Sequence, residues 1–98
     1  MLLKGKKALV TGSRRGIGAS IALTFAQEGA DVGINDIERD SEADNTIERI
    51  EQLGRKASWH MADIGNNECR QRLFDEFIAE HGRIDILVNN AVASRNVN

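Results

Sequence analysis

Residues 11–18, Thr11-Gly12-Ser13-Arg14-Arg15-Gly16-Ile17-Gly18, form a glycine-rich stretch between two different patterns of apolar residues. The preceding run, Ala8-Leu9-Val10, is typical of a buried strand. From Ile17 to Ala26, apolar residues recur at the three- and four-residue spacing of a helix, which Gly29 then ends. Glycines in such a turn let the backbone bend sharply and let an anionic group approach the free amides at the helix start. The stretch predicts an anion-binding turn; an ordinary strand-to-helix turn is the alternative.

The same alternation continues along the chain. Short apolar runs at 32–35, 57–62 and 84–88 predict three more strands. One further helix is expected around Ile47, Ile50 and Leu53, closed by Gly54, and another begins at Asn66 or Asn67 and ends at Gly82. The charged stretch 36–44 and the residues from 89 onward are predicted loops.

Alternating strands and helices are typical of right-handed crossovers and a parallel sheet. The strands are nearly continuous in apolar residues, as expected when both faces of a sheet are covered. Neither an internal repeat nor a low-complexity linker divides the chain. We predict one α/β domain, or part of one, with four strands and three helices.

Composition excludes several classes of protein. The 98 residues are 41% hydrophobic and 29% charged, and no apolar run approaches the roughly 20 residues that a membrane span needs. A net charge of −2 argues against a protein whose main role is to bind nucleic acid. The single cysteine, Cys69, excludes an internal disulfide and fits a reducing cytosol, and no export signal is recognisable. We therefore expect a cytoplasmic protein without membrane or nucleic-acid partners.

Asp36 ends the second predicted strand. An acidic side chain at that position, after a glycine-rich first turn, can accept hydrogen bonds from the ribose of a bound dinucleotide. Alone, Asp36 is better interpreted as a solvated loop carboxylate. Together with the glycine turn, the ribose interpretation is favoured.

Three motifs resemble the short-chain dehydrogenase/reductase family. They are Thr11-Gly12-x-x-x-Gly16-Ile17-Gly18, Asp63-Ile64 after the third strand, and Asp85-Ile86-Leu87-Val88-Asn89-Asn90-Ala91 after the third helix. Their order and separations fit, and the match covers nearly the whole chain. The resemblance implies a Rossmann-like, doubly wound parallel sheet, of which residues 1–98 would be the N-terminal, cofactor-binding part of a single NAD(P)-binding domain.

The resemblance also implies roles for individual residues. The pyrophosphate-binding turn would be formed by Gly12, Ser13, Arg14, Arg15, Gly16, Ile17 and Gly18. Asp36 would select the ribose, Asp63 and Ile64 would border the adenine, and Asn90 with Ala91 would line the path toward the nicotinamide. Without the resemblance, Asp63 is only a carboxylate at the ligand-binding edge of an open sheet, and Asn89 and Asn90 could equally be turn formers.

The sequence departs from the family pattern in two ways. Val92 occupies a position where members usually have glycine, and a β-branched residue there could crowd the cofactor. The family's catalysis uses a tyrosine acid/base, a lysine four residues later and a serine, whereas this chain contains no tyrosine. Ser94 lacks a base partner and receives no catalytic role, so no catalytic residue is assigned. Whether the 98 residues alone are an enzyme is left open.

The implied function is an NAD(P)-dependent oxidoreductase that transfers hydride between a nicotinamide cofactor and an alcohol or ketone, acting as a homo-oligomer. NAD is expected rather than NADP, because Asp36 would repel a 2′-phosphate, although Arg15 in the glycine turn argues the other way. The alternative is a catalytically inactive nucleotide-binding fragment or truncated product. A signalling receiver domain is disfavoured, because Thr11 and Gly12 stand where that class needs acidic residues.

The remaining candidates receive structural interpretations. His60 and His81 are expected to be unpaired, structural or solvated residues, and Cys69 is expected in the core. No metal site is predicted. Arg14 and Arg15 could attract phosphate, but an exposed arginine pair is usually just solvated.

Overall fold

The computed structural model describes residues 1–91; the predictions for Val92 and Ser94 concern positions outside this range. Seven elements follow one another: β1 (Lys7–Val10), α1 (Gly16–Gln27), β2 (Asp31–Asp36), α2 (Ser41–Gln52), β3 (Ala57–Met61), α3 (Asn67–His81) and β4 (Ile86–Val88). The predicted alternation of four strands and three helices is confirmed.

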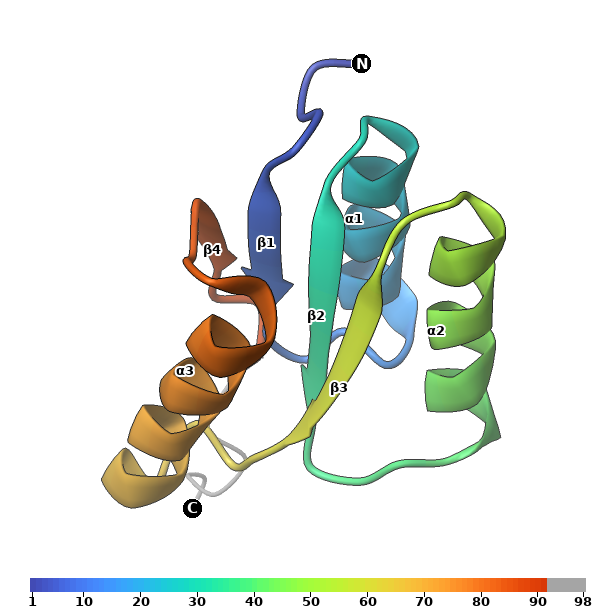
Figure 1. Cartoon of the computed structure of the whole chain (residues 1–98). Coiled ribbons are helices and arrows are strands. Elements are labelled where there is room, and N and C mark those ends of the chain that lie inside the picture. The colour runs from blue at the N-terminus through green and yellow to red at the C-terminus, as the bar shows by residue number, and fades with distance from the viewer. Residues whose placement is uncertain (92–98) are drawn as a thin grey trace.

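The strands form one parallel sheet in the order β3-β2-β1-β4. Helices α1 and α2 lie on one face of the sheet and α3 lies on the other (Figure 1). This three-layer, doubly wound arrangement confirms the predicted Rossmann-like class. The carboxyl ends of all four strands point to the same edge of the sheet, where such folds bind ligands (Figure 1).

Each face of the sheet has its own core. Val10, Ile34 and Ile50 belong to the cluster under α1 and α2, whereas Leu9, Leu73 and Phe77 form the cluster under α3. Gly33 in β2 lets α3 approach closely, since an added Cβ would lie 2.6 Å from the Phe77 ring. Alternation along β1 thus places neighbouring residues in opposite cores.

The prediction of a loop over 36–44 was wrong at its second half, because α2 already begins at Ser41. Asp40 caps this helix by accepting a hydrogen bond from the Ala43 N–H at 2.9 Å. The first turn carries Glu42 and Asp44, whose negative charges interact favourably with the positive end of the helix dipole. Acidic residues in this pattern are as typical of a helix start as of a charged loop.

The last strand is shorter than the predicted 84–88. Asp85 lies beside the start of β1 instead of continuing the ladder, with its carboxylate accepting from the Lys7 N–H at 2.8 Å. Of the four strands described, β4 forms one edge of the sheet, and its Leu87 side chain is 40% exposed. None of the helices within residues 1–91 is both long enough and apolar enough to cross a lipid bilayer.

Candidate nucleotide-binding site

The glycine turn between β1 and α1 has the backbone shape that its sequence requires. Gly12 and Gly16 both adopt positive φ, +64° and +63°, where an L side chain would be strained. A Cβ on Gly18 would lie 2.2 Å from the Gly12 carbonyl oxygen, so only glycine fits where α1 passes the turn. At Gly16 an added Cβ would meet no atom within 4 Å, and the backbone there faces open space.

The start of α1 differs from the starts of the other two helices. Asp40 and Asn66 cap α2 and α3 with side-chain oxygens. In the described part of the chain, no side chain caps α1, and its first turn contains no acidic residue. Its first backbone N–H groups and the positive end of its dipole therefore remain available to an anion.

A groove of about 230 Å³ lies at the carboxyl edge of the sheet. It brings together six of the predicted site residues: Gly12, Asp36, Asp63, Ile64, Asn90 and Ala91. Its other lining residues, Asn35, Ile37 and Ala62, were not among the predictions. Segments that are far apart in the sequence thus form one concave surface beside the glycine turn.

The other predicted residues, Ser13 to Gly18, do not line this groove. Arg14, Arg15 and Gly16 line a second groove of about 560 Å³ between α1 and α2. Ile17 is 75% exposed on α1. Ser13 is fully buried, and its hydroxyl donates to the Val10 carbonyl at 2.6 Å.

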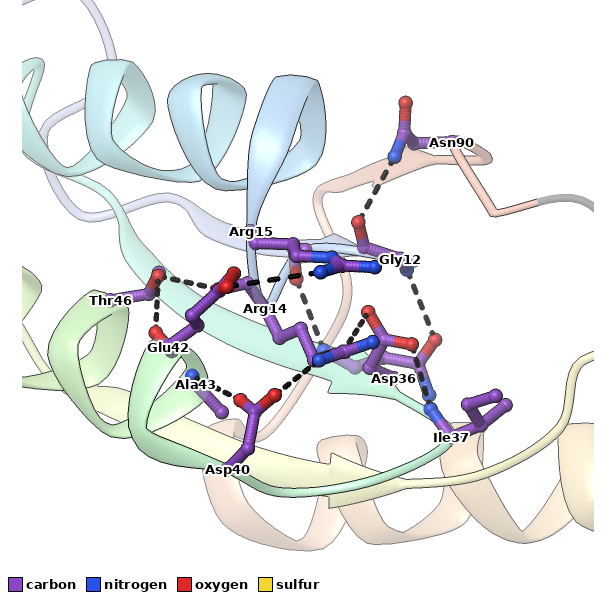
Figure 2. Close-up of polar contacts among 12 residues, drawn as sticks. Gly12, Arg14, Arg15, Asp36, Ile37, Asp40, Glu42, Ala43, Thr46 and Asn90 are labelled. Carbon is purple, nitrogen blue, oxygen red and sulfur yellow. Dashed lines mark hydrogen bonds and ion pairs between the residues drawn. The ribbon is translucent and has the colours of Figure 1, made fainter.

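Arg14 is held between two carboxylates (Figure 2). Its Nε lies 3.5 Å from Asp36 Oδ2, and its Nη1 contacts Asp40. The Arg14 side chain is only 12% exposed, so the interpretation of a solvated arginine pair was wrong for this residue. Arg15 is 60% exposed and lies 3.8 Å from Glu42, as a rim residue would.

The Asp36 carboxylate is oriented from two sides. Its Oδ1 accepts from the Ile37 N–H at 2.8 Å, and Arg14 lies beside its Oδ2. A carboxylate has about four lone-pair directions, so Asp36 keeps acceptor capacity toward the groove. Close by, the Ala43 N–H and then Arg14 hold the pKa of Asp40 below its ordinary value, against the opposing effect of burial.

Several hydrogen bonds join the end of β4, and the residues that follow it, to the glycine turn. The Thr11 hydroxyl accepts from the backbone N–H groups of Asn90 and Ala91 at 3.0 and 3.1 Å. The Asn90 side chain donates to the Gly12 carbonyl at 3.1 Å (Figure 2). Sequence reasoning quoted Thr11 only as part of a motif and missed its role as the anchor of residues 90 and 91.

The two histidines are not unpaired, contrary to expectation. Ser58 Oγ lies 2.7 Å from His60 Nε2 and 2.8 Å from His81 Nε2, which joins β3 to the end of α3. Burial, aided by the charge of Lys56, lowers the pKa of His81 to about 4. None of these three side chains lines the groove, and we interpret the cluster as structural. Cys69, expected in the core, is partly buried and packs against the core under α3.

The residues fit a bound dinucleotide in three respects. The start of α1 is uncapped and so can receive an anion, Gly16 leaves space beside it, and a carboxylate at the end of β2 could accept hydrogen bonds from a ribose. Residues 1–91 contain no cluster of three or more His, Cys, Asp or Glu side chains arranged to hold a metal ion. Fold and site define the class as a Rossmann-like nucleotide-binding domain.

Comparison with known proteins narrows the class to a family. The sequence model of the short chain dehydrogenase family matches residues 6–98, and the chain belongs to this family. It is 43% identical over 89 residues to a 3beta-hydroxysteroid dehydrogenase 1 of Eggerthella lenta, covering 91% of this chain and 34% of that relative. The solved structure of a short chain dehydrogenase from Burkholderia cenocepacia in complex with NADP matches with a TM-score of 0.89 and 43% identity, covering 93% of this chain and 37% of that one.

A third relative differs in length. The short-chain dehydrogenase/reductase homolog YusS of Bacillus subtilis is 38% identical over 97 residues, which cover 99% of this chain and 89% of YusS. The chain thus spans about a third of the length of the hydroxysteroid dehydrogenase and most of the length of YusS.

Proposed function

We propose that this chain binds the adenosine and pyrophosphate part of a nicotinamide dinucleotide, as the N-terminal part of a single NAD(P)-binding domain. Gly12, Asp36, Asp63, Ile64, Asn90 and Ala91 would border the adenosine and the path to the nicotinamide. The turn residues Ser13, Arg14, Arg15, Gly16, Ile17 and Gly18 would form and surround the pyrophosphate subsite. The observation that carries the proposal is the uncapped start of α1 together with the groove that Gly12 and Asp36 line.

The proposed activity of the whole protein is oxidoreduction of an alcohol or ketone. When bound, the cofactor supplies or accepts the hydride. This chain's residues bind and orient it, through the amides at the start of α1 and the Asp36 carboxylate. Two comparisons support this class: the family match and the similarity to a hydroxysteroid dehydrogenase. The whole protein is further proposed to be a homo-oligomer located in the cytoplasm.

NAD is the proposed cofactor in preference to NADP. Asp36 lines the groove, whereas Arg15 lines the neighbouring groove between α1 and α2 with its charge near Glu42. Arg14 offsets part of the Asp36 charge, but it is itself held by Asp40. The carboxylate should therefore dominate the environment of the ribose 2′ position.

A second candidate is a nucleotide-binding module without catalysis of its own. Its support is the similarity to YusS over most of the length of both chains, together with the absence of tyrosine from this sequence. Both candidates require the same nucleotide site and differ only in turnover.

Addition of NAD to the isotopically labelled chain tests the proposed site. We expect the amide resonances of Gly12, Gly16, Asp36 and Asp63 to shift. The amide resonance of Ser58, which lies within β3 and lines neither groove, should not shift. Shifts confined to the groove between α1 and α2, or none at millimolar NAD, would contradict the proposal.

A further inference from the structure

We infer that Asn35, which precedes Asp36 in β2, is a positioning residue that holds the two walls of the groove in register; this inference rests on the proposed function. Its side chain is 1% exposed. Oδ1 accepts from the Gly12 N–H at 3.3 Å, and Nδ2 donates to the carbonyls of His60 and Ala62 at 3.1 and 3.2 Å. One amide thus joins the glycine turn to the end of β3.

The Asn35 backbone is bonded to the same turn. Pairing between β1 and β2 ends where Val10 lies opposite Ile34. One residue further, the Asn35 carbonyl accepts from the Ser13 N–H at 2.8 Å, and the Asn35 N–H donates to Ser13 Oγ at 3.1 Å. Ser13 and Asn35 thereby extend the contact between the strands into the glycine turn.

Gly12 and Ala62 both line the groove, on opposite sides of Asn35. Asp63 follows Ala62 directly, so the Asn35 side chain sets the distance between the turn and the Asp63 wall. Among side chains of this length, that of asparagine combines a hydrogen-bond acceptor with two donor hydrogens. Truncation of Asn35 to alanine would remove the partner of the Gly12 N–H and of the His60 and Ala62 carbonyls. Buried polar groups that lose a partner are costly, so the turn and the end of β3 should shift to find other partners.

A ligand that contacts both walls should detect the change more than one that contacts a single wall. In the proposed binding mode, adenosine would contact the wall formed by Asp36 and Asp63, and ADP would add phosphates that contact the turn. We therefore compare the dissociation constants of adenosine and ADP for the 98-residue chain, the Asn35→Ala variant and the control Ser58→Ala. Ser58 Oγ also bonds across buried elements, but its partners are His60 and His81 and it does not line the groove.

Asn35→Ala is expected to reduce the advantage of ADP over adenosine by about tenfold, equivalent to about one hydrogen bond. Ser58→Ala should lower stability and leave that ratio unchanged. Hydrogen exchange of the Gly12 amide should accelerate in Asn35→Ala by more than exchange of the amides in α3. If Asn35→Ala does not fold, Ser13→Ala removes the hydroxyl that accepts from the Asn35 N–H, which weakens the contact between Asn35 and the turn and should lower the same ratio.

An unchanged ratio in a folded Asn35→Ala or Ser13→Ala chain overturns the inference and leaves the proposed function intact. A reduction that is equal in Ser58→Ala also overturns it, because it indicates a general effect of stability. Failure of the unmodified chain to bind ADP contradicts the proposed function itself, and this inference with it.

Discussion

Asp36 is the residue on which the proposed cofactor preference depends. Its carboxylate lines the groove, is 18% exposed and is oriented by Ile37 and Arg14. Two unit charges about 4 Å apart at an effective dielectric near 20 repel by roughly 4 kcal/mol. The nearby Arg14 guanidinium lowers this penalty for a 2′-phosphate, so the net preference for NAD should be smaller than that figure.

Replacing Asp36 tests this at the residue scale. Asp36→Ala removes the repulsion and the ribose acceptor together, so NADP should bind more tightly and NAD less tightly, narrowing the gap about tenfold or more. Calorimetric titration of both cofactors into the variant measures it. Asp40→Ala is the matched control, since it removes a carboxylate that also contacts Arg14 but does not line the groove. An equal narrowing in Asp40→Ala would contradict a specific role for Asp36.

At the scale of elements, the contact between β3 and α3 should weaken in acid. His81 is 8% exposed and its pKa is lowered to about 4, and burial also lowers the pKa of His60. An unfolded histidine titrates near 6.5, so the unfolded chain binds protons that the folded chain does not. Stability is therefore complete above about pH 6.5 and is lost as the pH falls toward about 4, by at most about 3 kcal/mol for His81.

Urea unfolding at neutral pH and near pH 5 measures this loss. His81→Phe keeps an aromatic ring against Phe77, with which His81 stacks at 4.3 Å, but cannot titrate. The variant should show a smaller loss of unfolding free energy on acidification than the unmodified chain. The same pH dependence in both would show that His81 does not carry the effect.

The sequence predicts the elements and the glycine turn well because their signals are local. The turn needs glycine at three positions: Gly12 and Gly16 adopt positive φ, and Gly18 has no room for a Cβ. The contacts that complete the site are different, because they join segments far apart in the chain. Neither the bonds of Asn35 to Gly12 and Ala62 nor the Ser58 bridge between the histidines has a local pattern.

At the scale of the whole molecule, the 98 residues alone should not turn over an alcohol or ketone. The chain contains no tyrosine, and a positioned general acid/base contributes about 10²- to 10⁴-fold to a rate. The measurement is NADH formation or consumption with a panel of alcohols and ketones, including hydroxysteroids. Turnover that copurifies with the chain and exceeds a protein-free control would contradict this.

The chain should also self-associate. β4 forms a sheet edge among the described strands, with Leu87 exposed, and Ile17 adds exposed apolar surface on α1. An open edge offers unpaired amides and carbonyls to another strand. Sedimentation should give an average mass that rises with concentration above the 10.8 kDa of one chain. A constant monomer mass across concentrations would be the contrary result.

The groove that Asp36 lines is proposed to bind the adenosine ribose of a nicotinamide dinucleotide. The most direct test of this proposal is calorimetric titration of the unmodified chain, at low protein concentration, with NAD and NADP in parallel. The proposed site predicts that both bind at one site and that NAD binds more tightly. Tighter binding of NADP, or no heat of binding with either cofactor, would contradict it.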